Sequence, residues 1–218
     1  MTTLYLIRHS VRMKRDDIET YNTTQPRIIK EEKIILSSVG EKRAEILSKE
    51  EELQNIDVVY TSNCVRTLQT AKYMMESQNI KANIDERLDE RRVGIINDQE
   101  VPDWFIRQYK DFDYKTIGGE SMREVQTRFS EVINEILEKH KDKRIAVFTH
   151  GYATTSYLLK YCKLLYVSEE RLEIEYNGKT LYNRRLNAPE VFKLTFEDKE
   201  LTNIELIEFE DLPYNHGV

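Results

Sequence analysis

The stretch Leu4-Tyr5-Leu6-Ile7-Arg8-His9-Ser10-Val11-Arg12 decides the fold of this 218-residue chain. Four apolar residues run directly into an arginine and a histidine. A short continuous apolar run is typical of a buried strand in an α/β sheet. Ligands of open α/β sheets bind just beyond the carboxyl ends of such strands. The stretch therefore predicts either a chemical site at Arg8 and His9 or a strand that simply ends in polar residues.

A second short apolar run ends in the same way. Ile145-Ala146-Val147-Phe148 leads into Thr149-His150-Gly151, so two of the four histidines follow predicted strands at equivalent positions. If the two strands are parallel neighbours, the imidazoles of His9 and His150 meet at one edge of the sheet. This coincidence favours a site over a plain strand end.

Helical and extended patterns alternate along the rest of the chain. Ser38-x-x-Glu41 is a capping box that predicts a helix running to about Leu53, and Ser121-x-x-Glu124 predicts the start of a longer amphipathic helix. Further strands are predicted at 58–60, 82–84, 191–196 and 201–207. The alternation predicts an α/β fold, a three-layer α/β/α sandwich with a mostly parallel central sheet and helices on both faces.

Three segments break this alternation. Residues 11–36 are predicted to form a long loop, and residues 95–118 to form an active-site cap that contains the only tryptophan, Trp104. Residues 163–185 are polar and rich in tyrosine, with a turn at Asn177-Gly178. Because no repeat or low-complexity linker divides the chain, we expect a single domain over 1–218.

Composition limits the classes of function. The sequence is 39% hydrophobic and 33% charged, as in soluble globular proteins. Its 33 Lys and Arg against 39 Asp and Glu, a net charge of −6, argue against nucleic acid as a partner. No apolar segment approaches the roughly 20 residues that cross a bilayer, and no signal peptide is apparent. Cys64 and Cys162 form no CxxC motif, so we expect a cytoplasmic protein with no membrane partner.

The residues near the two histidines favour an anion. Metal binding is the alternative for a histidine pair, but a cation site needs carboxylates or thiolates around it. The neighbouring loops and helix starts instead supply arginines, whose planar guanidinium groups match phosphate oxygens: Arg8, Arg12, Arg66 and Arg91. Several arginines should also lower the pKa of a histidine and leave a ring nitrogen free to attack. The chemistry that fits is phosphoryl transfer to histidine, and we expect no metal.

Phosphoryl transfer to histidine also needs a proton donor for the leaving alcohol. Glu90 is the first candidate, because it ends a short strand-like stretch and is followed by Arg91, Arg92 and Gly94. Asp89 is the competing candidate.

These motifs together resemble the histidine phosphatase superfamily, which includes the cofactor-dependent phosphoglycerate mutases. The resemblance is to the branch whose second histidine is followed by glycine, and it extends from residue 4 to about 196. It is carried by six ordered segments: Leu6-Ile7-Arg8-His9, Leu36-Ser37-x-x-Gly40-x-x-x-Ala44, Tyr60-Thr61-Ser62-x-x-x-Arg66-Thr67-x-Gln69-Thr70-Ala71, Leu88-Asp89-Glu90 with Gly94, Gly118-Gly119-Glu120-Ser121 with Val125 and Arg128, and Val147-x-x-His150-Gly151.

The resemblance implies a role for each matching residue. His9 would be the nucleophile that becomes phosphohistidine, while Arg8, Arg66 and His150 would bind the phosphoryl group. Glu90 would protonate the leaving oxygen and then activate water. No metal or organic cofactor is implied.

Two departures from the family pattern bear on activity. Ser10 stands where the family usually has glycine, so the backbone there must tolerate a Cβ. The loop after Arg12 lacks the Trp-Asn pattern of the glycolytic mutases, which favours a phosphatase. Arg12 itself is similar to a third phosphate contact of the acid phosphatase branch.

We therefore expect a phosphomonoester hydrolase that acts through phosphohistidine on a small phosphorylated metabolite. Ser10, Arg91 and Arg92 are candidate substrate-binding residues, and the expected partner is a small-molecule phosphate ester. The alternatives are mutase-type phosphoryl transfer and a catalytically silent phosphate-binding module. The oligomeric state is not predicted.

Overall fold

The central sheet of the computed structural model, which describes residues 1–14, 31–95 and 103–217, has the strand order β3-β2-β4-β1-β8-β9. Its strands are β1 (Thr2–Arg8), β2 (Val58–Thr61), β3 (Ala82–Ile84), β4 (Arg144–Thr149), β8 (Glu190–Glu197) and β9 (Glu200–Ile207). The first four strands of this order run parallel, and β8 and β9 form an antiparallel hairpin beside β1. The predicted mostly parallel sheet is confirmed, as are the late strands.

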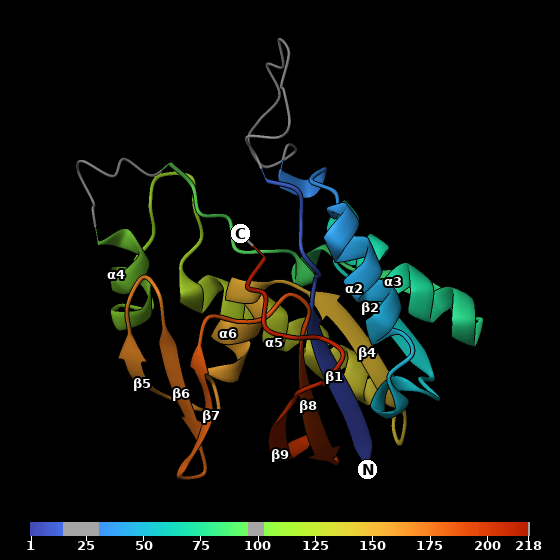
Figure 1. The fold of residues 1–218 in the computed structure, drawn as a ribbon. Helices are drawn as coiled ribbons and strands as arrows, with labels where there is room; N and C mark the ends of the chain where they lie inside the picture. The colour runs from blue at the N-terminus through green and yellow to red at the C-terminus, as the bar shows by residue number, and fades with distance from the viewer. Residues whose placement is uncertain (15–30, 96–102, 218) are drawn as a thin grey trace.

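Helices cover both faces of this sheet (Figure 1). The helices are α2 (Ser38–Leu47), α3 (Val65–Gln78), α5 (Met122–Lys139) and α6 (Gly151–Leu158), and short 3-10 turns lie at Glu51–Leu53 and Glu86–Leu88. Leu4 and Leu6 of β1 pack with α5 and α6, whereas Tyr5 and Ile7 pack with α2 and α3. Because successive side chains of a strand point to opposite faces, β1 is buried on both sides. This explains its continuous apolar run and confirms the three-layer fold.

The two predicted capping boxes differ in outcome. At α5 the box forms as predicted: Ser121 Oγ accepts the Glu124 N–H at 3.1 Å, and Glu124 Oε2 accepts the Ser121 N–H at 2.8 Å. At α2 the N-cap is Ser37, one residue earlier than predicted, and its Oγ accepts the Gly40 N–H at 3.1 Å. The helix ends at Leu47 rather than near Leu53.

Gly40 lets α2 begin directly against the backbone that follows His9. A Cβ at position 40 would lie 2.0 Å from the Val11 carbonyl oxygen. The same oxygen accepts the Ser37 N–H at 2.9 Å. The start of α2 is therefore tied to the loop that carries the first histidine.

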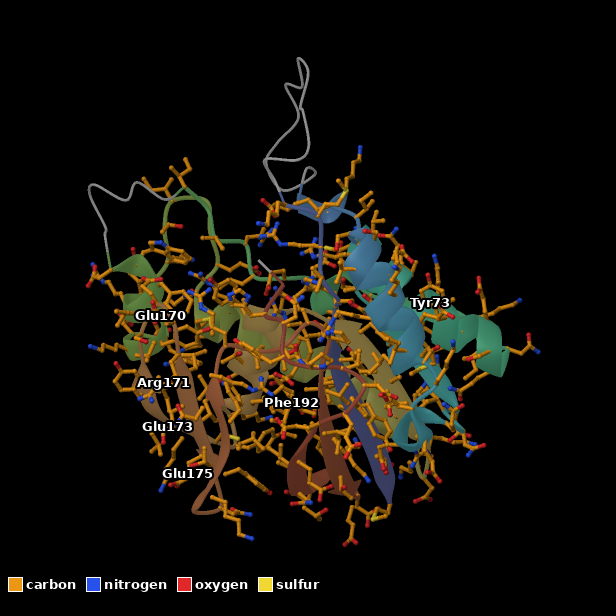
Figure 2. The ribbon with its side chains drawn as sticks, in the orientation of Figure 1. Tyr73, Glu170, Arg171, Glu173, Glu175 and Phe192 are labelled. Carbon is orange, nitrogen blue, oxygen red and sulfur yellow. The ribbon has the colours of Figure 1, made fainter. Side chains whose placement is uncertain are left out.

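A second, antiparallel sheet was not predicted. It consists of β5 (Lys163–Val167), β6 (Leu172–Tyr176) and β7 (Lys179–Arg184). The predicted turn at Asn177-Gly178 joins β6 to β7, and both residues have positive φ, as hairpin turns require. Figure 2 shows Glu173 and Glu175 along β6 and Phe192 near the centre of the molecule. The Phe192 ring packs on Tyr182 of β7 at 5.8 Å between centroids, which joins the two sheets.

Parts of the irregular segments lie outside the described residues. Residues 15–30 of the predicted loop over 11–36 and residues 96–102 of the predicted cap over 95–118 are among them. The described part of the cap contains α4 (Trp104–Lys110), which lies above the second sheet in Figure 1. Within the ranges that the structure describes, no helix is long and apolar enough to span a membrane.

Candidate active site

The structure brings the two predicted histidines together at the carboxyl edge of the parallel strands. β1 and β4 pair in register with Arg8 opposite Thr149, and the His9 N–H donates to the Thr149 carbonyl at 2.9 Å. The two imidazole centroids are 5.2 Å apart. Both rings are buried, since His9 is 5% and His150 0% exposed.

The hydrogen bond of His9 leaves one ring nitrogen available as a nucleophile. Its Nδ1 lies 2.7 Å from the Ser10 carbonyl oxygen. Because a carbonyl oxygen only accepts, Nδ1 carries the proton and Nε2 keeps its lone pair. Burial first, and then Arg66 and Arg8, lower the pKa of His9 well below its ordinary value of 6.5. His9 is therefore neutral, with its single ring proton on Nδ1.

Ser10 fits this loop with an ordinary backbone. It is not among the described residues with positive φ, and its N–H donates to Thr70 Oγ1 at 3.0 Å. The side chain is fully buried, and Ser10 does not line the cavity described below. The Cβ that the family pattern usually lacks is accommodated.

Arg66 lies at the start of α3 and contacts His150. Its NH2 group is 3.0 Å from His150 Nδ1, and its NH1 group donates to the Glu31 carbonyl at 2.6 Å. Its Nε has no hydrogen-bond partner among the described residues although it is buried. An unpaired buried donor costs free energy, so this atom is suited to an incoming anion.

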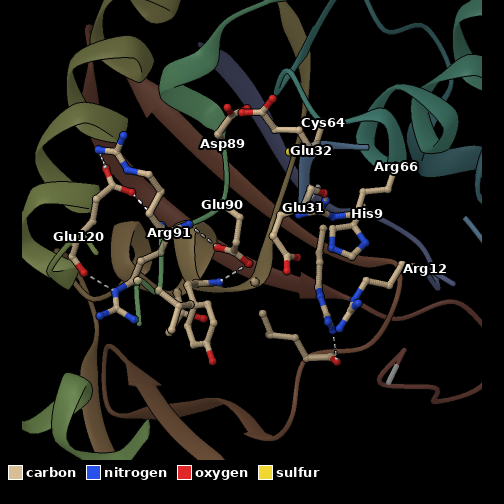
Figure 3. Close-up of a pocket in the computed structure, with 18 of the residues that line it drawn as sticks. His9, Arg12, Glu31, Glu32, Cys64, Arg66, Asp89, Glu90, Arg91 and Glu120 are labelled. Carbon is tan, nitrogen blue, oxygen red and sulfur yellow. Dashed lines mark hydrogen bonds and ion pairs between the residues drawn. The ribbon is translucent and has the colours of Figure 1, made fainter. Parts of the chain in front are cut away.

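Arg8 is fixed by backbone carbonyls from the distant end of the chain. One nitrogen, NH1, donates to Leu186, Asn187 and His216 at 2.6, 3.0 and 3.2 Å. Its Nε faces the start of α6, where a Cβ at Gly151 would lie 3.6 Å away. Figure 3 shows His9, Arg12 and Arg66 on one side of the cavity, so the predicted arginine cluster is assembled.

The two candidate acids occupy different environments. Glu90 accepts backbone N–H groups of Arg91 at 2.9 Å, Ala153 at 3.1 Å and Tyr152 at 3.3 Å, the last two from the first turn of α6. Asp89 accepts the Asn63 N–H at 2.7 Å, and burial raises its pKa to about 6. In Figure 3, Glu90 points into the cavity beside Glu31, whereas Asp89 lies near Glu32 and Cys64.

Arg91 and Arg92 point in different directions. Arg91 is 2% exposed: its Nε donates to the Glu120 carbonyl at 2.7 Å and its NH1 to Gln108 Oε1 at 2.5 Å. Its NH2 has no partner within the described part of the chain. Arg92 is exposed and reaches the Glu120 carboxylate at 3.5 Å. Both arginines line the same cavity as His9.

The cavity has a volume of about 1020 Å³. It is lined by residues from the central sheet, from the second sheet and from the helices and loops beside them. Phe105 and Tyr109 of α4, which lie in the segment 95–118 proposed as a cap, line the cavity, as does Arg185 after β7, which was not predicted. Glu31 and Glu32 were also missed, since two adjacent glutamates in a polar loop carry no pattern that separates them from solvated residues. His150 is fully buried, 3.0 Å from the Arg66 guanidinium and 5.2 Å from His9 between ring centroids.

One group of side chains has the residue types of a metal site. Ligand atoms of Cys64, Asp89 and His150 lie within 4.8 Å of one another. However, the Arg66 guanidinium is 3.0 Å from His150 Nδ1, and burial raises the pKa of the Cys64 thiol to about 11. A neighbouring positive charge and a protonated thiol fit a cation poorly.

A family model and several known proteins match the sequence of the chain. The family model for the histidine phosphatase superfamily (branch 1) matches residues 4–191. The chain is 28% identical over 138 residues to phosphoserine phosphatase 1 of Hydrogenobacter thermophilus, which covers 60% of this chain and 64% of that protein. It is 26% identical over 182 residues to the probable phosphoglycerate mutase GpmB of Yersinia enterocolitica. This match covers 80% of this chain and 81% of that protein.

Solved structures share the fold. YhfR of Bacillus stearothermophilus superimposes with a TM-score of 0.69 at 20% identity, over 100% of this chain and 98% of that one. A mycobacterial glucosyl-3-phosphoglycerate phosphatase in complex with VO3 superimposes with a TM-score of 0.68 at 18% identity. This superposition covers 95% of this chain and 98% of that chain. From the family match over residues 4–191 and the shared fold, we conclude that the chain belongs to the histidine phosphatase superfamily.

Proposed function

We propose that this protein is a phosphomonoester hydrolase that acts on a small phosphorylated metabolite through a phosphohistidine at His9. The observation that carries the proposal is the unprotonated Nε2 of His9 in a cavity that also holds Arg8 and Arg66. A neutral nucleophile beside fixed positive charges is what attack on a phosphate ester requires.

In the proposed first step, His9 Nε2 forms a bond to phosphorus while the bond from phosphorus to the alcohol oxygen breaks. Arg8, Arg66 and Arg12 neutralise the phosphoryl oxygens, and His150, 3.0 Å from Arg66, binds the phosphoryl group with them. Glu90 gives its proton to the leaving alcohol oxygen. The Ser10 carbonyl, 2.7 Å from Nδ1, stabilises the positive charge that develops on the ring.

In the second step, Glu90 takes a proton from water as the water oxygen forms a bond to phosphorus, while the bond from phosphorus to His9 Nε2 breaks and its electron pair returns to Nε2. Inorganic phosphate leaves, and both residues return to their starting protonation states. This cycle needs neither a metal nor an organic cofactor, and we propose that the protein uses none.

Arg91 and Arg92 are proposed to select the alcohol part of the substrate. The buried NH2 group of Arg91 is suited to a second anionic group. Relatives named as phosphatases of phosphoserine and of glucosyl-3-phosphoglycerate support a small phosphorylated metabolite. We further propose a single domain over 1–218 in which 95–118 caps the cavity, and a cytoplasmic location, which the buried free thiols of Cys64 and Cys162 support.

The second candidate function is mutase-type transfer, which relatives named as probable phosphoglycerate mutases favour. A mutase must return the phosphoryl group before water takes it. Turnover of 3-phosphoglycerate with a bisphosphate primer separates the two. A silent phosphate-binding module is the remaining alternative, and it would bind phosphate esters without turnover.

The test is trapping of the intermediate with phosphate esters labelled with ³²P, from a panel of phosphoserine, phosphoglycerates, sugar phosphates and nucleotides. The wild-type protein should carry acid-labile label during turnover, and His9→Ala should lose both label and activity. His140→Ala is the matched control, since His140 bonds Tyr60 rather than the cavity. Ordinary activity in His9→Ala would exclude the mechanism.

A further inference from the structure

A largely buried ion pair lies beside the segment that carries Glu90. Glu120, two residues before α5, is 7% exposed, and Arg128, in the second turn of that helix, has a side chain that is 19% exposed. Arg128 donates to the Glu120 carboxylate from Nε at 3.0 Å and from NH2 at 3.2 Å. Because taking two charges out of water is expensive, a pair of this kind is a poor way to gain stability alone.

Arg128 also bonds the main chain before and at Glu90. Its NH1 donates to the Arg87 carbonyl at 2.6 Å, and its NH2 donates to the Glu90 carbonyl at 3.4 Å. All three guanidinium nitrogens therefore donate to acceptors within the protein. This distinguishes Arg128 from Arg66, whose Nε has no partner among the described residues. Arg128 thus serves the backbone rather than a bound anion.

Glu120 bonds the chain on the other side of Glu90. Its Oε2 accepts the Arg92 N–H at 2.9 Å, and its own N–H donates to the Arg92 carbonyl at 2.7 Å. Its carbonyl accepts Arg91 Nε at 2.7 Å. Figure 3 shows Glu120 and Arg91 on one side of Glu90 and His9 on the other. The ion pair therefore holds the main chain both before and after the proposed acid.

The placement of this main chain matters to the rate of proton transfer. The N–H groups of Tyr152 and Ala153 direct the Glu90 carboxylate from α6, whereas the ion pair fixes the segment that carries Glu90 to the start of α5. A general acid must lie within roughly 2.6–3.2 Å of the atom that it protonates. A displacement of about 1 Å can cost about 10²-fold in rate.

We propose that Glu120 and Arg128 are positioning residues that act as one unit, holding the main chain on both sides of Glu90 so that its carboxyl group meets the leaving oxygen. The inference rests on the proposed function, because it takes Glu90 as the general acid. It places the effect of the pair in the protonation of the alcohol rather than in the binding of the phosphoryl group. It also explains why two charges are buried at this point of the fold.

The first arm of the test compares kcat/KM for an alkyl and an aryl phosphate in Arg128→Lys. Lysine keeps the positive charge, but its one ammonium nitrogen cannot reproduce the planar fork that joins the carboxylate to both carbonyls. The alkyl ester should lose about 10–100-fold. The aryl ester, whose phenolate needs little protonation, should lose less than about threefold. Because unfolded protein lowers both rates by the same factor, the ratio of the two rates reports the acid alone.

Two further variants sharpen this comparison. Arg123→Lys is the matched control, since Arg123 lies on the same helix and its Nε donates to the exposed Asp113 at 2.6 Å. It should leave the ratio of alkyl to aryl rates unchanged. Glu120→Gln keeps an oxygen for the Arg92 N–H, so it should change the ratio less than Glu120→Ala. Thermal unfolding should show that all variants are folded at the assay temperature.

The second arm does not depend on turnover. In protein labelled with ¹⁵N, the amide signals of Tyr152 and Ala153 report the hydrogen bonds that Glu90 accepts, and Glu90→Ala gives their positions without it. In Arg128→Lys both signals should move toward their positions in Glu90→Ala. In Arg123→Lys they should stay where they are in the wild type.

The outcomes separate this inference from the proposed function. Equal losses on alkyl and aryl esters in Arg128→Lys, or an unchanged ratio, would overturn the positioning role, because the pair would then be merely structural. Absence of turnover in the wild type, with both amide signals displaced in Arg128→Lys, would contradict the proposed hydrolase and leave the placement of Glu90 by the pair standing. Absence of turnover with unmoved amide signals would overturn both.

Discussion

Replacing Glu90 with glutamine tests the general acid and separates it from its neighbour Asp89. The Glu90→Gln side chain keeps an oxygen for the N–H groups of Arg91 and Ala153, at 2.9 and 3.1 Å. It places an amide NH2 where Oε2 accepted the Tyr152 N–H at 3.3 Å. The structural cost is thus one long hydrogen bond at the start of α6, about 1 kcal/mol.

The cost in rate should be much larger and should depend on the leaving group. A general acid typically contributes 10²–10⁴-fold, which corresponds to about 3–5 kcal/mol in the activation barrier. An alkyl phosphate such as phosphoserine should therefore lose about 10²–10⁴-fold in kcat/KM. An aryl phosphate, whose phenolate leaves without protonation, should lose less than about tenfold.

The assay is kcat/KM across a series of alkyl and aryl phosphates for both variants. Asp89→Asn is the matched control, because an asparagine oxygen can still accept the Asn63 N–H at 2.7 Å. It should cost both classes of ester a similar, small factor. Equal losses on alkyl and aryl esters in Glu90→Gln, or a steeper dependence on leaving group in Asp89→Asn, would refute the assignment.

Two further predictions concern stability. Glu120 accepts hydrogen bonds from Arg128 at 3.0 and 3.2 Å. Burial raises the pKa of Glu120, but Arg128 outweighs this effect and holds the pKa below the ordinary 4.5. Glu120→Gln should therefore lower the free energy of unfolding, measured in urea at pH 7, by about 3 kcal/mol. Because the pKa of Glu120 is lower in the folded protein, its carboxylate contributes its full stabilisation above pH 4.5 and loses it as the pH falls through the lowered pKa. The difference in unfolding free energy between wild type and Glu120→Gln should therefore shrink below pH 4.5. A difference that stays constant with pH would contradict this prediction. Gly40→Ala should destabilise by about 1–3 kcal/mol or more, because its Cβ would lie 2.0 Å from the Val11 oxygen. Gly151→Ala, whose Cβ meets only ordinary contacts, should cost less in the same unfolding measurement, and the reverse order would contradict the packing argument.

The elements that the sequence predicts correctly are those whose pattern follows from burial alone. β1 and β4 are buried on both faces, so their apolar runs are continuous. On α5, the predicted apolar stripe and the capping box both form, because each depends only on residues within one helix. The histidine pair followed from these strands, since register in a parallel sheet places strand ends together.

The misses depend on contacts between distant segments. At α2, Ser38-x-x-Glu41 satisfies the capping pattern, but Ser37 also bonds the Val11 carbonyl through its N–H and Oγ, and this contact decides the start. The second sheet escaped prediction because β5 is mostly exposed and its pairing with β6 is irregular near Leu164, so no regular alternation marks it.

In the site, too, the residues that belong to local motifs were predicted, whereas their contacts with distant segments were not. The arginines and Glu90 were predicted from motifs, but the support of Glu90 by α6 and of Arg8 by residues near the end of the described chain is not encoded locally. The cap was expected over 95–118, but the part of the cavity wall contributed by the second sheet was not expected, because that sheet was not predicted.

The position of β1 between β4 and β8 has a consequence for synthesis on the ribosome. Leu4 pairs with Ile145 on one side and with Leu194 on the other. At about 5–20 residues per second, translation separates Leu4 from Leu194 by roughly 10–40 s. Such long-range pairings are intrinsically slow to form. During this interval the apolar strand that precedes His9 lacks its β8 partner, so nascent chains should depend on chaperones. A fragment that stops before β8 should hold no working phosphate site.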